Sequence, residues 1–192
     1  MEEYQPSRIT DGKRVSIDIK DASFSWGFRV QQDKKVIASR KKLEVEQDDE
    51  ATITNVNFNV TSGDLVVIVG QVGSGKTTLL HSIMNETRIR EGVCDVQGTI
   101  AYVEQEPFIF SASIKENILL GKIYDEELFN EALQCSSLIN DIKEFSNGAD
   151  TVIGERGVNI SGGQKARISL ARAVYSEADV YLLDDPLSAV DP

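Results

Sequence analysis

A glycine-rich run, Gly70-Gln71-Val72-Gly73-Ser74-Gly75-Lys76-Thr77, restricts the possible folds of this chain more than any other segment, because it matches the pattern G-x-x-x-x-G-K-[ST]. A continuous, β-branched apolar run at residues 65–69 precedes it and predicts a strand buried on both faces. Residues 77–85 follow it and predict a helix. From average composition, the pattern arises by chance in on the order of one chain in a hundred of this length. The flanking strand and helix make chance a poorer explanation, so we interpret residues 70–77 as a phosphate-binding loop.

The chemistry of such a loop explains its composition. Glycines let the backbone curl so that successive N–H groups point at an anion, and the N-terminus of the following helix adds its positive end. Lys76 is expected to reach the β- and γ-phosphates of a nucleotide, and the Thr77 hydroxyl to ligate Mg²⁺. The loop therefore predicts ATP and Mg²⁺ as ligands.

The composition describes an ordinary globular chain with an acidic surface. Its 192 residues are 41% hydrophobic and carry a net charge of −11, which allows one substantial core and a small second lobe. The negative charge argues against nonspecific binding to nucleic acid. Cys94 and Cys135 are far apart and predict unpaired, buried thiols. No apolar run approaches the roughly 20 residues of a membrane span, so we expect a soluble, cytosolic segment; the spans of any membrane protein that it serves would lie in other sequence.

Short β patterns fill the N-terminal half of the chain. Residues 15–19 and 55–60 alternate apolar and polar side chains and predict half-buried strands. Residues 61–64 predict a turn, and residues 93–103 predict two further strands split at Gly98.

The pattern becomes helical after Pro107. A capping box at Ser113 and Glu116 predicts a short helix to Leu120. Further helices are expected from the cap at Asp125, over residues 138–145, and from Ser161 to near Tyr175; a fully buried strand at residues 180–183 follows, ending in Asp184-Asp185. Strands at both ends with helices between them predict an α/β nucleotide-binding core with an inserted helical lobe.

Two further segments have residues suited to binding ions, one a metal cation and the other an anion. Asp184, at the end of an apolar strand, is expected to hold Mg²⁺ through water; alone it would be a solvated strand end, but the phosphate loop favours the metal role. The run Ser161-Gly162-Gly163-Gln164 at a helix start is either a plain N-cap or a second anion site. Since Lys76 already accounts for one γ-phosphate, a second site implies a second nucleotide, most simply one on a partner domain.

These three motifs, in this order and spacing, resemble a nucleotide-binding domain of the ATP-binding-cassette family. The resemblance covers nearly all of residues 15–192 and is greatest to the first nucleotide-binding domain of the C subfamily, the multidrug-resistance-associated transporters. The residues that carry it are Phe24-Ser25-Trp26, Ala101-Tyr102-Val103-Glu104-Gln105, residues 116–121, and the run from Ile153-Gly154-Glu155 through Asp184-Asp185 to Asp191.

The resemblance implies roles that the residues alone leave open. A single tryptophan is most often a core or surface anchor, but Trp26 is implied to stack on adenine. Gln105 is implied to reach Mg²⁺ and the attacking water. Residues 161–164 would be the signature segment that closes on ATP held by the partner domain, and residues 188–191 would cross the dimer interface. The implied cofactor-binding set is Trp26, Gly70, Gln71, Val72, Gly73, Ser74, Gly75, Lys76, Thr77, Thr78, Ser161, Gly162, Gly163 and Gln164, with Thr77, Gln105 and Asp184 for the metal.

The implied fold is one domain with a P-loop NTPase (RecA-like) core, a mixed sheet, an antiparallel β part near the N-terminus and an inserted α-helical subdomain. We expect a flexible N-terminal segment (1–14), then the β part and phosphate-loop core (15–106). The core includes a charged loop or disordered insert at 28–50, for which a short exposed helix is the alternative. The helical subdomain with the signature would span 107–176, and the return strand and interface loop 177–192.

Two departures from the family pattern matter. Most cassettes have a glutamate directly after the strand-end aspartate to polarise the attacking water, whereas this chain has Asp185, one methylene shorter. We therefore expect slow turnover at its own site, with Asp185 and Gln105 as catalytic residues, while the intact signature completes a competent partner site. The family also has a switch histidine beyond the interface loop; His81, expected on a helix surface, cannot serve, so we expect the chain to be a truncated domain.

Three functions follow from these expectations. The first is an ATPase domain of an exporter on the cytosolic face of a membrane, partnered by a second nucleotide-binding domain and by transmembrane domains. The second is a nucleotide-sensing domain of a channel or channel regulator of the same subfamily, which the slow site suits equally well. The third, a soluble cassette of DNA repair or translation, is disfavoured by the acidic charge and by residues 105–121.

Overall fold

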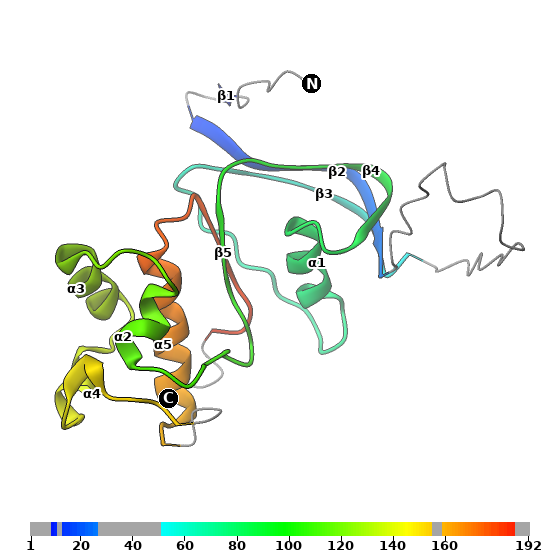
Figure 1. Ribbon diagram of the computed structural model, residues 1–192. Helices are drawn as coiled ribbons and strands as arrows, with labels where there is room; N and C mark the ends of the chain where they lie inside the picture. Colours follow the sequence, from blue (N-terminus) through cyan, green and yellow to red (C-terminus); the bar gives the residue numbers. More distant parts are fainter. Residues whose placement is uncertain (1–8, 11–12, 27–50, 155–158, 187–192) are drawn as a thin grey trace, which may run out of the picture. The chain divides into compact units, whose positions relative to one another are not determined.

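The computed structural model describes residues 9–10, 13–26, 51–154 and 159–186, which belong to two compact units, residues 1–97 and 98–192 (Figure 1). The first unit is an antiparallel sheet with one helix, and the second is a group of helices with a pair of parallel strands. The charged insert expected at 28–50 and the interface loop expected at 188–191 both fall completely outside the described residues.

The sheet of the first unit is built around one long strand. Strand β2 (Lys13–Ser25) pairs antiparallel with β1 (Ile9–Thr10), β3 (Ile53–Thr61) and β4 (Arg88–Val96). Along β3, Val56, Phe58 and Val60 are half-buried, whereas the asparagines between them are exposed. The predicted alternation and the predicted antiparallel β part near the N-terminus are therefore confirmed.

The predicted turn after β3 is also present, and its side chains explain why it forms. The Asp64 N–H donates to the Thr61 carbonyl at 3.0 Å, and the Asp64 carboxylate accepts from the Thr61 N–H and hydroxyl at 2.9 and 2.6 Å. Gly63 has φ 86°, in the left-handed region that glycine adopts without steric cost.

Helix α1 (Lys76–Ile83) begins inside the phosphate loop, and its buried residues include Leu80 and Ile83. The strand predicted at residues 65–69 is wrong as a description of this structure. The run has no strand assignment, and Leu65 and Val69 are 89% and 85% exposed. None of the described strands pairs with it, and a strand is buried only when neighbouring strands and helices cover it.

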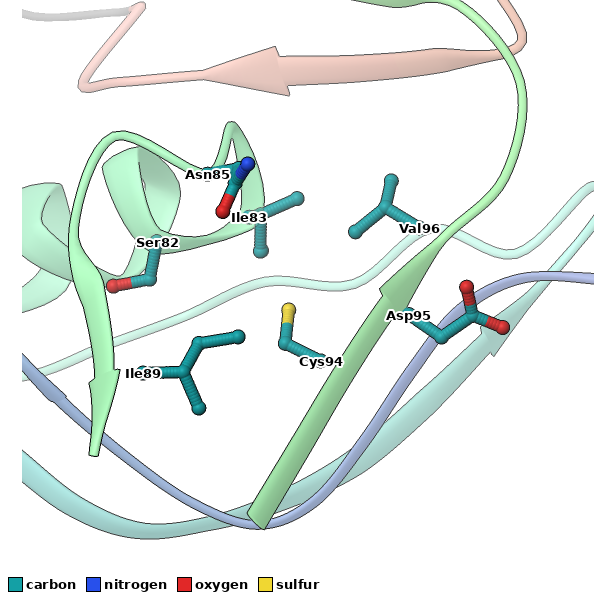
Figure 2. A pocket seen from close by; sticks show the side chains of 7 residues that line it. All are labelled: Ser82, Ile83, Asn85, Ile89, Cys94, Asp95 and Val96. Carbon is teal, nitrogen blue, oxygen red and sulfur yellow. The ribbon is translucent and has the colours of Figure 1, made fainter. Parts of the chain in front are cut away.

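A cavity of about 270 Å³ lies between the C-terminal end of α1 and strand β4 (Figure 2). The Cys94 side chain points into it, on the side facing Ile83. Cys94 and Cys135 are unpaired as predicted, but Cys135 is exposed rather than buried. Burial, and to a smaller extent the neighbouring Asp95 carboxylate, raise the pKa of the Cys94 thiol, so the thiol is protonated and unreactive near neutral pH.

The helices of the second unit pack around its longest member, α5 (Gly162–Tyr175) (Figure 1). The others are α2 (Ile114–Leu119), α3 (Glu126–Cys135), α4 (Ile139–Glu144) and the short 3₁₀ helix η1 (Gly148–Asp150). Ser113 and Glu116 form the predicted capping box, and Asp125 caps α3 as predicted. The apolar core includes Ile114, Ile118, Phe129, Leu138, Ile153, Ile168 and Tyr175.

The two strands of this unit, β5 (Ile100–Val103) and β6 (Val180–Leu183), pair in parallel, with Val103 opposite Leu183. Helices α2 to α5 all lie in the connection between them. The expectation that β6 is fully buried is wrong: Tyr181 and Leu183 are 45% and 40% exposed, because only the face that carries Val180 and Leu182 is covered. In the part of the chain that the structure describes, no helix has the length and apolarity of a membrane span.

Candidate functional site

The phosphate loop at residues 70–77 has the backbone that its glycines predict. Gly73 and Gly75 have φ 79° and 91°, backbone angles that residues other than glycine rarely adopt. A Cβ on Gly70 would lie 2.7 Å from the Ser74 hydroxyl, and one on Gly75 would lie 2.7 Å from the Ile53 side chain. A side chain at Gly70 would therefore press against the loop itself and one at Gly75 against strand β3, so glycine at both positions suits a backbone cradle for an anion.

Lys76 places a cation across this loop. Its Nζ donates hydrogen bonds to the carbonyl oxygens of Gly70 and Gln71 at 3.0 and 2.9 Å. Thr77 follows in the first turn of α1 with an exposed side chain. A bound phosphate would offer Lys76 charged oxygens in place of carbonyls, and hydrogen bonds between charged groups are the stronger kind.

Trp26 lies beside the first turns of α1 although it is far away in the sequence. Its indole N–H donates to the Thr78 hydroxyl at 3.3 Å, and its ring meets the His81 ring edge-on with centroids 5.3 Å apart. Trp26 is 47% exposed, so part of its ring faces solvent. His81, expected on the helix surface, is partly buried and pairs with Glu86. The structure thus brings an aromatic platform to the helix that carries Lys76.

Gln105 and Asp184 follow the carboxyl ends of paired strands. Gln105 is exposed and comes two residues after β5, whereas Asp184 comes directly after β6 and is 7% exposed. The Asp184 N–H continues the strand pairing to the Val103 carbonyl at 2.9 Å, and its carboxylate accepts from the Tyr102 hydroxyl at 3.3 Å. Because the strands are parallel, both residues emerge at the same edge of the pair.

Each predicted metal ligand, taken by itself, has the chemistry that Mg²⁺ prefers. The Thr77 hydroxyl of the first unit, and the Gln105 carboxamide and Asp184 carboxylate of the second, are oxygen ligands, and Mg²⁺ takes few protein ligands while keeping several waters. Clusters of three or more His, Cys, Asp or Glu side chains, which would suit a transition metal, do not occur among the described residues. Asp185 is exposed and has φ 49°, a left-handed conformation that aspartate tolerates better than most residues.

The signature segment forms the N-terminus of α5. The Ser161 hydroxyl accepts from the Gln164 N–H at 3.2 Å, and the Ser161 N–H donates to Gln164 Oε1 at 2.9 Å, a complete capping box. Ser161 and Gly162 are exposed, and a Cβ on Gly162 would meet nothing within 4 Å. The first N–H groups of a helix have no intrahelical acceptor, so this end can donate to an anion.

Two residues that contact this segment, Asp141 and Arg167, were not predicted from the sequence. Gln164 Nε2 donates to Asp141 Oδ1 at 3.2 Å, and the Arg167 guanidinium donates to both oxygens of the same carboxylate at 2.8 Å. Burial would raise the pKa of Asp141, but the hydrogen bonds from Arg167 and Gln164, with the charge of Arg167, hold it below its ordinary value. Arg167 could have been suspected from its i+3 spacing to Gln164, whereas no local pattern identifies Asp141.

The cavity shown in Figure 2 is not part of this candidate site. Its lining comes from the C-terminal end of α1 and from β4, and the phosphate loop lies before the other end of that helix. The predicted residues divide between the two units: Trp26, residues 70–77 and Thr78 in the first, and Gln105, residues 161–164, Asp184 and Asp185 in the second.

Comparison with known proteins gives consistent matches. The profile of a family described as "ABC transporter" matches residues 53–188. The chain is 49% identical over 146 residues to ABC transporter C family member 12 of Dictyostelium discoideum, covering 76% of this chain and 11% of that protein. It is 42% identical over 181 residues to ABC transporter C family member 9 of Arabidopsis thaliana, covering 94% of this chain and 11% of that protein.

A human relative gives the same result. ATP-binding cassette sub-family C member 4 of Homo sapiens is 48% identical over 140 residues, covering 73% of this chain and 11% of that protein. The chain thus spans about 11% of the length of these curated relatives.

Proposed function

The chain belongs to the ABC transporter family of ATPases, and on this basis we propose that it is the first nucleotide-binding domain of a C-family transporter. It binds Mg-ATP on residues 70–77 and lends residues 161–164 to a second ATP, held by a partner domain. ATP binding closes the pair and drives transport, and hydrolysis at the competent site reopens it.

One observation carries this proposal: the phosphate loop and an aromatic ring lie at the same helix. Lys76 spans the loop by hydrogen bonds to Gly70 and Gln71, and Trp26 is tied to Thr78 two residues further along α1. A triphosphate in the loop would meet the Lys76 cation and the helix N-terminus. Its adenine would stack on the exposed part of the indole, which gives ATP both its charged and its aromatic contact.

The metal and the finer fold belong to the same proposal. Thr77, Gln105 and Asp184 would hold Mg²⁺, which when bound neutralises charge on the transferred phosphate. We propose a P-loop, RecA-like core with an inserted helical subdomain, supported by the parallel pair β5–β6 and by the helices in the connection between these strands.

The domain's own site would hydrolyse ATP slowly. Asp185 stands where a glutamate would polarise the attacking water, and its carboxylate is one methylene short. A positioned base contributes roughly 10²–10⁴-fold to the rate of hydrolysis. A carboxylate that lies too far from the attacking water loses much of that factor. The intact capping box at Ser161 supports a competent site on the partner, giving one slow site and one fast site.

The partners of this domain are proposed from its family. A second nucleotide-binding domain would face it head to tail across two ATP molecules, and transmembrane domains of the same transporter would bind its helical subdomain. The domain would then lie on the cytosolic face of a membrane. The transported substrate would be chosen by the membrane domains.

A nucleotide-sensing domain of a C-family channel or channel regulator is the second candidate, and Asp185 is the observation that favours it. A slow site keeps ATP bound, which suits a sensor. ATP-dependent uptake into vesicles containing the intact protein supports the transporter, and ATP-gated currents without uptake support the sensor. Lys76→Ala should weaken Mg-ATP binding at this domain by more than about tenfold in either case, and unchanged Mg-ATP binding would refute the proposal.

A further inference from the structure

The capping box of α5 depends on the orientation of one side-chain amide. Gln164 Oε1 accepts from the Ser161 N–H at 2.9 Å, while Gln164 Nε2 donates to the Asp141 carboxylate at 3.2 Å. If the amide were flipped, Nε2 would face an N–H donor and Oε1 would face a negative carboxylate, so both contacts would be repulsive. Asp141 therefore selects the orientation in which Gln164 can hold Ser161.

The consequence reaches the atoms that would bind phosphate. The Ser161 oxygen already accepts the Gln164 N–H at 3.2 Å, so its hydroxyl proton remains available to donate. The N–H groups of Gly162 and Gly163, at the first two helical positions, lack intrahelical acceptors. With the Ser161 N–H engaged by Gln164, the Ser161 hydroxyl and the N–H groups of Gly162 and Gly163 are the donors that this helix end can offer to a phosphate.

Asp141 is itself held in place. Arg167 donates from Nε and Nη2 to the two Asp141 oxygens, each at 2.8 Å, and the side chain of Asp141 is 11% exposed. Such bidentate pairs fix the carboxylate plane as well as its position. Asp141 sits on α4 and Arg167 on α5, so the pair joins the two helices.

We propose that Asp141 is a positioning residue for the signature segment: through Gln164 it presets the phosphate donors of Ser161, Gly162 and Gly163. This inference rests on the proposed function, in which residues 161–164 complete the partner's ATP site. It assigns to α4 an influence, exerted through Gln164, on the rate at which ATP at residues 161–164 is hydrolysed.

The test is ATP hydrolysis by the intact transporter with a charge-exchange pair of variants. Gln164→Glu keeps the Asp141–Arg167 ion pair but places two carboxylates together, and kcat should fall about tenfold or more, since lost transition-state donors cost roughly 10²–10³. In the double variant Asp141→Asn with Gln164→Glu, the new amide at position 141 can donate to the new carboxylate at position 164, and one carboxylate remains beside Arg167. The double variant should recover to within about threefold of wild type.

The KM for ATP should stay within about twofold in all variants, because the partner's own loop grips that nucleotide. Glu144→Gln is the matched control, as Glu144 is an exposed acid on the same helix, and it should leave kcat unchanged. A double variant no faster than Gln164→Glu alone overturns the inference, whether or not Asp141→Asn folds by itself.

A separate variant distinguishes failure of the inference from failure of the proposed function. Gly162→Asp adds a negative side chain where a Cβ has open space, so it should fold and abolish hydrolysis at the partner site. If Gly162→Asp hydrolyses ATP at the wild-type rate, the signature role itself is wrong. If it is inactive while the double variant shows no rescue, only the role of Asp141 is wrong.

Discussion

The Trp26 indole donates a hydrogen bond to the Thr78 hydroxyl, which joins the end of the first long strand to the helix that carries the phosphate loop. The bond is 3.3 Å long, and the Trp26 ring also packs edge-on against the His81 ring. Two side chains of α1 thus hold the orientation of an aromatic ring that the sequence alone would have left as an ordinary anchor.

This contact makes the first prediction. Trp26→Ala should weaken Mg-ATP binding about tenfold, because base–aromatic stacking contributes roughly 1–3 kcal/mol. Trp26→Tyr should keep most of the affinity, and Thr78→Val should lose less than Trp26→Ala, since the ring remains. Calorimetric titration with Mg-ATP measures all three, and equal affinities for wild type and Trp26→Ala would contradict the adenine platform.

The phosphate loop gives the second prediction. Lys76→Ala should reduce Mg-ATP affinity by more than about tenfold, because hydrogen bonds to charged groups contribute about 1.5–3 kcal/mol each. Lys143→Ala, which removes an exposed lysine from α4, serves as the control and should bind as wild type does. Titration with a fluorescent ATP analogue compares them. If the two variants bound equally well, Lys76 would not be a phosphate ligand.

Asp185 gives the third prediction. Asp185→Glu should raise turnover at this domain's own site at least about tenfold, part of the roughly 10²–10⁴ that a well-placed base supplies. Because Asp185 has φ 49°, which glutamate tolerates less well, the variant should also unfold at a slightly lower temperature. Asp185→Asn keeps the backbone preference and removes the base, and it should be slower than wild type. Single-site turnover in the intact transporter, with the partner site inactivated, separates the three, and no gain from glutamate would refute the geometric explanation.

The antiparallel sheet gives the fourth prediction. A Cβ on Gly92 would lie 2.3 Å from the carbonyl oxygens of Lys20 and Asp21, and Gly92 has φ 73°. Gly92→Ala should therefore destabilise the first unit by more than about 2 kcal/mol. Gly63→Ala shares the positive φ but has open space, so it should cost only about 1 kcal/mol. Hydrogen exchange of β2 and β4 compares them; similar effects would show that the close backbone approach is unimportant.

Acid stability gives the fifth prediction. Burial would raise the pKa of Asp141, but Arg167 and Gln164 outweigh that effect and hold the pKa below its ordinary value. The resulting stabilisation is present above the unfolded-state pKa of about 3.9 and is lost as the pH falls through the lower folded-state value. Asp141→Asn should lower the unfolding temperature at pH 7 and bring it closer to wild type at about pH 2–3. A temperature gap that stayed constant with pH would contradict the depressed pKa.

Features that depend on near neighbours could be predicted from the sequence. The caps at Ser113, Asp125 and Ser161 lie where the sequence places them, since each is a contact between a residue and one three positions later. The alternation of β3 and the left-handed glycines of the phosphate loop are equally local properties. The motifs that led to the family assignment are of the same kind, because they are short runs with fixed spacing.

Contacts between residues that are far apart in the sequence were revealed only by the tertiary structure. Trp26 and Thr78 are 52 residues apart, and Asp141 lies 23 residues before Gln164, so no local pattern could pair them. The exposure of residues 65–69 and of one face of β6 could likewise not be predicted from the sequence. An apolar run records that a segment can be buried, but burial is decided by whichever elements pack against it, and that information is distributed over the whole chain.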